Sequence, residues 1–167
     1  MTGAIERLWY LLALVGREEE HLLGVSSRLF VGGQVTPAWL EGVLAVPEGI
    51  DRLESFVGKF SRMQDTMMDK LLPTFLVAIG ERSSTALDNL NLAHKLQFVT
   101  DPDAWLAMRL LRNKLVHEYV EDVTELAAAL VKARDLTAEL SRSFRVIREY
   151  AARSLPRPAA SETSTDG

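Results

Sequence analysis

The chain contains no cysteine among its 167 residues. A disulfide framework and thiolate zinc sites are therefore excluded, and the composition fits the reducing cytoplasm in which we expect the protein to reside. Apolar runs are short: none approaches the roughly 18 residues of a membrane span. The longest near the start, Leu8–Val15, lacks a basic leader and a small-residue cleavage site, so we predict neither a signal peptide nor a membrane partner.

Histidine is also scarce. His21, His94 and His117 are the only three, and they do not have the mutual spacing of metal ligands, so we expect no metal site and no cofactor. The net charge of −4 argues against broad, non-specific coating of nucleic acid. Local basic patches remain compatible with it.

What the chain does have is apolar residues at three- and four-residue steps, which predict helices throughout. The expected helices span about 5–30, 37–45, 47–79, 86–99 and 104–117, followed by a last helix that Glu121-Asp122 or Thr124 begins and that runs past Ala151. We therefore predict an all-α, up-and-down helical bundle with about four main helices plus short ones. The bundle should occupy residues 1–154, and residues 155–167, rich in Pro, Ser, Thr and Ala, should be disordered.

Local signals refine this prediction. Gly32-Gly33 should stop the first helix, and Thr36-Pro37 should cap and start the next. Pro73 lies inside the long third helix, where a kink is expected. On the same helix Gln64 falls in the middle of the apolar stripe, and Asp65 lies on its flank.

The string Arg112-Asn113-Lys114-Leu115-Val116-His117-Glu118-Tyr119 carries the chemistry. Arg112 can hold phosphoryl oxygens with its fork of donors, and His117 can move a proton near neutral pH. Asn113 can orient the histidine, and the hydroxyl of Tyr119 can bind a phosphate or ribose. These residue types together indicate chemistry on an RNA or nucleotide phosphodiester.

Helical geometry does not place these side chains at one point. Asn113 and His117 are four apart and share a face, as do Arg112 and Tyr119, but Arg112 and His117 lie about 140° apart around a helix. Either the helix ends near Val116, or the long side chain of Arg112 bends around to the face of Asn113 and His117. Both alternatives place the group at a helix end.

The order Arg-Asn-x-x-x-His-x-Tyr resembles the signature of the HEPN family (higher eukaryotes and prokaryotes nucleotide-binding domain), in which Arg-x4-6-His marks metal-independent RNases. Two further features are similar to the small HepT-like toxins and the nucleotidyltransferase substrate-binding proteins of that family. Trp105 precedes the motif by seven residues, and the segment 59–65 ends in an acid, Asp65, five positions after Phe60. The resemblance implies that Asp65 faces Arg112 and His117. A solvated charge on the helix flank is the alternative for Asp65.

The resemblance also implies partners. Two protomers of such proteins pair so that their motifs line one cleft, which would gather two copies of Arg109, Arg112 and Lys114. In the HepT-like branch a minimal nucleotidyltransferase acts as antitoxin and adds AMP to the motif tyrosine, here Tyr119.

Three functions stay open from the sequence. The first is a homodimeric endoribonuclease toxin with Arg112, His117 and Asn113 as catalytic residues and RNA as substrate. The second is a non-catalytic HEPN module that binds a nucleotide or the transferase. The third is a structural bundle in which Arg112 and Tyr119 only tie helices together.

Overall fold

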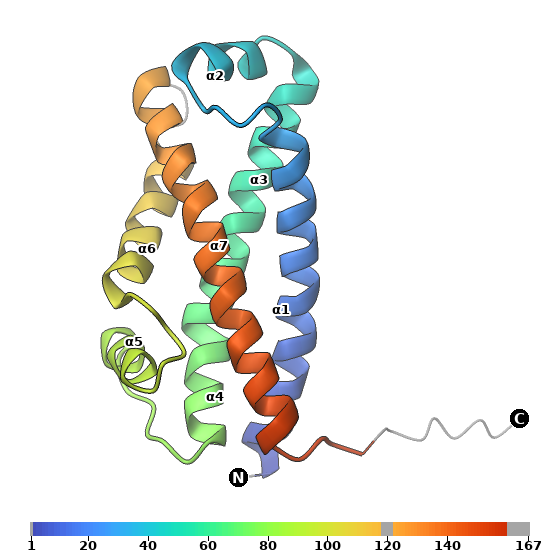
Figure 1. Cartoon of the computed structure of the whole chain (residues 1–167), viewed down its shortest axis with the longest axis vertical. Helices are drawn as coiled ribbons and strands as arrows, with labels where there is room; N and C mark the ends of the chain where they lie inside the picture. The colour runs from blue at the N-terminus through green and yellow to red at the C-terminus, as the bar shows by residue number, and fades with distance from the viewer. Residues whose placement is uncertain (1, 118–121, 160–167) are drawn as a thin grey trace, which may run out of the picture.

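The computed structural model describes residues 2–117 and 122–159, with residues 2, 116 and 117 described by their backbone alone. Every regular element in these ranges is helical, which confirms the all-α prediction. The elements are α1 (Thr2–Leu29), α2 (Pro37–Leu44), α3 (Pro47–Thr66), a π-helical turn η1 (Met67–Leu71), α4 (Leu72–Ala78), α5 (Ala86–Lys95), α6 (Pro102–His117) and α7 (Val123–Ser154) (Figure 1).

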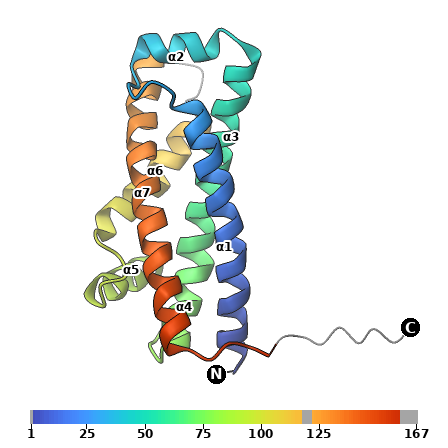
Figure 2. The ribbon, with the colours of Figure 1, turned by 45° about the vertical axis from the view of Figure 1, so that its right-hand side comes forward.

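Four long rods form the bundle: α1, the continuous rod α3–η1–α4, α6 and α7 (Figure 1). The short α2 crosses one end, and the first and last helical residues lie at the other end, as a second view also shows (Figure 2). The short α5 packs beside α4 and α6. Helix α6 contacts α3 on one side and α7 on the other. This position determines which of its side chains are buried.

The expected helix boundaries follow from local chemistry. Gly32 and Gly33 have φ values of 93° and 81°, in the left-handed region that favours glycine, and α1 ends just before them. Thr36 accepts a hydrogen bond from the backbone N–H of Trp39 at 3.1 Å, so it caps α2 as predicted. Asp122 caps α7 by accepting from the N–H groups of Thr124 and Glu125.

The rod α3–η1–α4 contains an irregularity whose position the sequence indicated only roughly. A kink was expected at Pro73, and the structure instead has the π-helical turn η1 immediately before it, closed by a hydrogen bond from the N–H of Leu72 to the carbonyl of Met67. Proline has no N–H, and its ring would clash with the carbonyl four residues back, that of Asp69. Widening the turn that contains Asp69 relieves this clash and keeps the rod continuous.

Helix α5 is shorter than expected. We predicted helix to Val99, but α5 ends at Lys95, and Gln97 adopts a left-handed φ of 70°. The N–H of Phe98 then bonds back to the carbonyl of Ala93 at 2.8 Å, which is the pattern of a Schellman cap. The sequence-based boundary was wrong because a glutamine occupies the position where glycine usually signals such an end.

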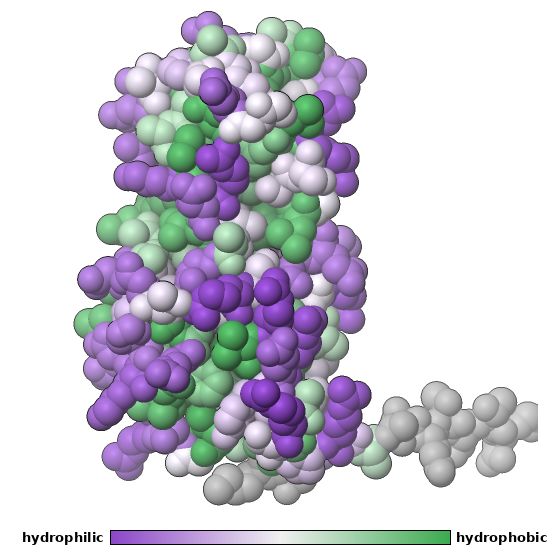
Figure 3. Space-filling model, in the orientation of Figure 1, coloured by the Kyte–Doolittle hydropathy of each residue, from purple (hydrophilic) through white to green (hydrophobic). Residues whose placement is uncertain are grey.

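Aromatic side chains fill both ends of the core. Phe30 contacts Trp39 and Phe56 at the α2 end, and Phe75, Phe98 and Tyr150 pack edge to face at the other. Hydrophilic residues cover much of the surface seen in Figure 3, with small apolar areas between them. Within the described ranges, no helix combines the length and apolar character needed to cross a membrane.

Candidate functional site

Helix α6 carries most of the predicted site residues, and its burial pattern fixes their directions. Near its start, Asp101 accepts a hydrogen bond from the N–H of Asp103 at 3.0 Å. The four apolar residues expected to point inward are all buried: Trp105, Met108, Leu111 and Leu115. The polar residues between them are therefore held on the flanks and outer side of the helix.

Arg109 and Arg112 leave α6 on the flank that faces α3, because they are three residues apart. Nη1 of Arg112 donates to Oδ1 of Asp65 at 3.0 Å, and Nη2 of Arg109 pairs with Asp69. The side chains of Arg112 and Asp65 are 34% and 35% exposed. Asp65 thus contacts the first residue of the motif and is not an isolated charge on the helix flank.

The other predicted residues are not all brought to this point. Asn113 is exposed on the outer side of α6, and Lys114 pairs with Glu125 of α7 at 3.6 Å, on the opposite flank from Arg112. The helix stays regular through His117, and the side chain of Arg112 contacts Asp65 on the flank that faces α3. Only the backbone of His117 is described, and Tyr119 lies outside the described residues.

A hollow of about 430 Å³ lies along α3 and η1 beside the ion pairs. Asp65 and Asp69 line it together with two cations, Arg62 and Lys70, whose side chains make no hydrogen bond or ion pair with a described residue. Because Asp69 pairs with Arg109 and Asp65 with Arg112, α6 runs antiparallel to α3 here, and its last turn lies near Arg62. Around this hollow, four basic side chains accompany two acidic ones, a balance that favours an anion.

Sequence reasoning missed Arg62 and Lys70. Arg62 lies three residues before Asp65 and shares its helix face, which is the signal that could have found it, whereas no three- or four-residue step links Lys70 to either acid. Asp69 and Lys70 lie within η1, which changes the helical period, so a helix face through them cannot be drawn from the sequence.

A buried carboxyl group lies beneath the hollow. Burial raises the pKa of Glu18, and a hydrogen bond with Thr66 and the charges of Arg62 and Lys70 only partly oppose this rise. Oγ1 of Thr66 lies 3.0 Å from Oε1 of Glu18 and 2.9 Å from the carbonyl of Arg62. The hydroxyl of Thr66 has one hydrogen, which it shares between Glu18 and the carbonyl of Arg62.

A second charged cluster holds α6 to α7. Glu139 accepts from Nε and Nη2 of Arg142 at 3.0 and 3.1 Å, from the N–H of Thr100 at 3.2 Å and from the indole of Trp105 at 3.4 Å. Burial alone would raise the pKa of Glu139, but these hydrogen bonds together outweigh it and hold the pKa below its usual value. Trp105 is therefore fixed at both its apolar ring and its N–H.

Among the described residues, no group of three or more His, Asp or Glu side chains is arranged to hold a metal ion. No protein-family model, curated protein or solved structure matches the chain.

Proposed function

We propose that this chain is a HEPN-type, metal-independent endoribonuclease and the toxin of a bacterial toxin–antitoxin pair. The observation that supports it most is the 3.0 Å contact between Arg112 and Asp65, an acid that lies 47 residues away and that the motif resemblance singled out as its neighbour. Burial of Trp105 on the inner side of the same helix is a second point of agreement. The two unpaired cations of the hollow, Arg62 and Lys70, add charge suited to a phosphodiester.

In the proposed reaction the 2′-hydroxyl of the RNA attacks the adjacent phosphorus. The bond from phosphorus to the 5′-oxygen breaks, so the products are a 2′,3′-cyclic phosphate and a 5′-hydroxyl. The proton of the 2′-hydroxyl goes to a base, and the leaving 5′-oxygen takes a proton from an acid. His117 suits either task because its ordinary pKa lies near 6.5.

Arg112 would stabilise the negative charge that develops on the phosphoryl oxygens. It makes one hydrogen bond among the described residues, through Nη1, so Nη2 and Nε remain available for a phosphate. Asp65 would act as a positioning residue that fixes the plane of this guanidinium. Asn113, one helical turn before His117, would orient the histidine.

Each chain supplies one His117, and the reaction needs both a base and an acid. A homodimer would supply two, one for each proton transfer. A minimal nucleotidyltransferase would neutralise the toxin by adding AMP to Tyr119, since the added negative charge would repel an RNA phosphate. Incubation with a cognate transferase and ATP should then raise the intact mass of the protein by one AMP, and Tyr119→Phe should abolish this gain.

The purified protein tests the central part of the proposal. It should cleave RNA in the presence of a metal chelator, and a substrate with 2′-O-methyl groups should resist. Arg112→Ala and His117→Ala should each lower the cleavage rate by about 100-fold or more. The matched control is Arg145→Ala, which removes an exposed arginine on α7 and should leave the rate unchanged.

Cleavage that persists in His117→Ala would contradict the proposed reaction. Absence of cleavage by the wild-type protein, together with a stable complex with the transferase, would favour the non-catalytic binding module instead.

A further inference from the structure

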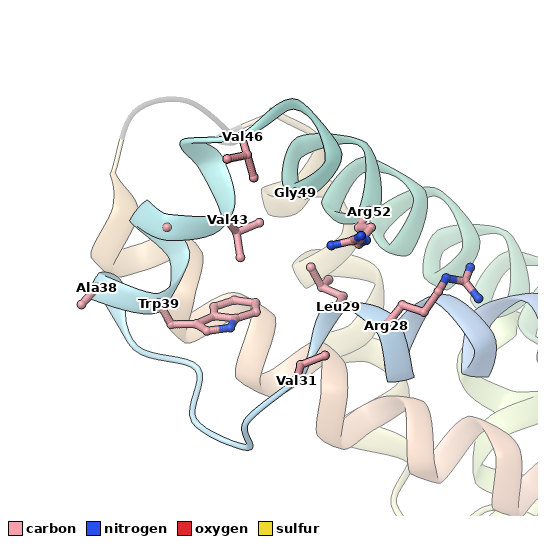
Figure 4. Close-up of a pocket in the computed structure, with 10 residues that line it drawn as sticks. Arg28, Leu29, Val31, Ala38, Trp39, Val43, Val46, Gly49 and Arg52 are labelled. Atoms are coloured by element: carbon pink, nitrogen blue, oxygen red, sulfur yellow. The ribbon is translucent and has the colours of Figure 1, made fainter.

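A second hollow, independent of the RNase proposal, lies at the end of the bundle where α2 crosses (Figure 4). It has a volume of about 450 Å³ and is enclosed by the end of α1, by α2 and by the start of α3. This volume lies in the range of sites for small molecules, which is about 300–1,000 Å³.

The walls of this hollow are mainly apolar. Leu29, Val31, Trp39, Val43 and Val46 line it, and Figure 4 shows these side chains around one space. Val31 and Val46 are 68% and 46% exposed, which places two of the large exposed apolar residues of the described chain at a single hollow. Such a cluster of exposed apolar surface is typical of a binding site.

The rim of the hollow carries positive charge without a partner. Arg28 of α1 and Arg52 of α3 line it, although the guanidinium of Arg28 lies back along α1 near Gly24, and no acidic residue lines the hollow (Figure 4). Neither arginine side chain makes a hydrogen bond or ion pair with a described residue, whereas Arg109, Arg112, Arg134 and Arg142 each have a carboxylate within 4 Å. An anionic group is the complement that this rim lacks.

Two glycines set the size of the space. A Cβ atom at Gly49 would come within 2.0 Å of the carbonyl oxygen of Val43, so this glycine permits the close approach of α2 and α3. Gly42 lines the hollow, and a Cβ atom there would meet nothing within 4 Å. Glycine in a helix costs about 1 kcal/mol relative to alanine, so packing does not explain Gly42, which instead leaves the hollow open.

We propose that this hollow binds a small anionic amphiphile, a carboxylate or phosphate ester on an aliphatic or aromatic body. The body would lie against Trp39 and Val43, and the anionic group would lie at Arg52, with Arg28 adding positive charge nearby. Binding requires both the apolar body and the anionic group of the ligand. The walls of the hollow offer few polar partners, and the charged groups at its rim are cations.

Calorimetric titration with decanoate below its micelle concentration tests this site, with decylamine as the cationic counterpart of the same length. Decanoate should bind, and decylamine should bind at least about tenfold more weakly. The variant Gly42→Leu should fill the hollow and lower the affinity for decanoate at least about tenfold. The double variant Arg28→Gln/Arg52→Gln should have a similar effect.

Two controls match these changes elsewhere. Gly58→Leu adds the same side chain to an exposed α3 position where a Cβ atom also meets nothing within 4 Å, and Arg17→Gln removes an arginine beside a different groove. Both should bind decanoate as the wild type does, and thermal unfolding should show all variants folded. No binding of decanoate, equal binding of decylamine, or equal effects of Gly42→Leu and Gly58→Leu would overturn the proposal.

Discussion

Two clusters of charged side chains hold α6 in the bundle, and they differ in how far their hydrogen bonds are satisfied. At the α7 side, Glu139 receives four hydrogen bonds from Arg142, Thr100 and Trp105, and its side chain is only 17% exposed. At the α3 side, Arg112 and Asp65 share one hydrogen bond, and each side chain is about one third exposed.

We propose that this difference separates a structural role at Glu139 from a binding role at Arg112. The oxygens of Glu139 are already occupied, so the carboxylate contributes to stability and has little left to offer a ligand. Arg112 keeps most of its donors, and an exposed ion pair with a single contact contributes little to folding. The two clusters are therefore expected to respond in opposite ways to mutation, with stability lost at one and activity lost at the other.

The largest effect on stability is expected at Glu139. Glu139→Ala leaves Trp105, Thr100 and Arg142 without their acceptor and should lower the free energy of unfolding by about 2–3 kcal/mol, measured by urea denaturation. RNA cleavage per folded molecule should not change. Because the folded-state pKa of Glu139 is lowered, its contribution is present above the unfolded-state pKa of about 4.5 and is lost as the pH falls through the folded-state value.

A smaller effect, on activity, is expected at Asp65. Asp65→Asn removes the charge that fixes the guanidinium of Arg112 and should lower kcat for RNA cleavage about tenfold, or about 1.4 kcal/mol, with little change in KM. The free energy of unfolding should change by less than about 1 kcal/mol. Glu125→Gln, which alters the exposed pair with Lys114 on the other flank of α6, is the control and should retain its cleavage rate. Equal kcat values for the two variants would show that Asp65 does not position Arg112 for the reaction.

The next effect concerns a buried polar group beside the site. Gln64 is fully buried, donates to Sδ of Met68 at 3.2 Å, and has no described partner for Oε1. Gln64→Met has nearly the same shape and removes this unsatisfied oxygen, so it should raise the free energy of unfolding by about 1 kcal/mol. Gln64→Ala controls for shape and should be destabilising because it leaves a cavity. A destabilised Gln64→Met protein would mean that Oε1 has a partner.

The smallest effect is a change with pH at Glu18. Its folded-state pKa is raised, so the folded state is favoured at low pH and loses stability as the pH rises from the unfolded value of about 4.5 through the folded value. Glu18→Gln keeps a neutral group and should match the wild type at about pH 4 and exceed it in stability at neutral pH. A difference that does not vary with pH would show that folding does not raise the pKa of Glu18.

The helices could be predicted from the sequence because their signals are local. Each signal determines the structure of only one or two helical turns. Examples are the spacing of apolar residues in α6, the N-cap at Thr36 and the glycines after α1. The end of α5 was missed because Gln97 adopts a conformation usually signalled by glycine, and η1 was missed because proline only indicates that the preceding turn must adapt.

The contacts of the candidate site could be predicted only where a sequence motif linked residues far apart in the chain. Asp65 was tied to Arg112 by the resemblance of both segments to one family. The role of Glu139 was not predictable, because its partners Thr100 and Trp105 lie 39 and 34 residues away and no local pattern marks them. The hollow at Gly42 could not be foreseen either, since the sequence does not show how closely Gly49 lets α2 approach α3.

The most direct test compares the RNA cleavage rates of Arg112→Gln and Arg142→Gln under conditions in which both proteins are folded. Both substitutions remove one positive charge, one from each cluster. The proposed function predicts a loss of about 100-fold or more for Arg112→Gln and a rate close to that of the wild type for Arg142→Gln. Equal rates in the two variants, or no RNA cleavage by the wild-type protein, would contradict it.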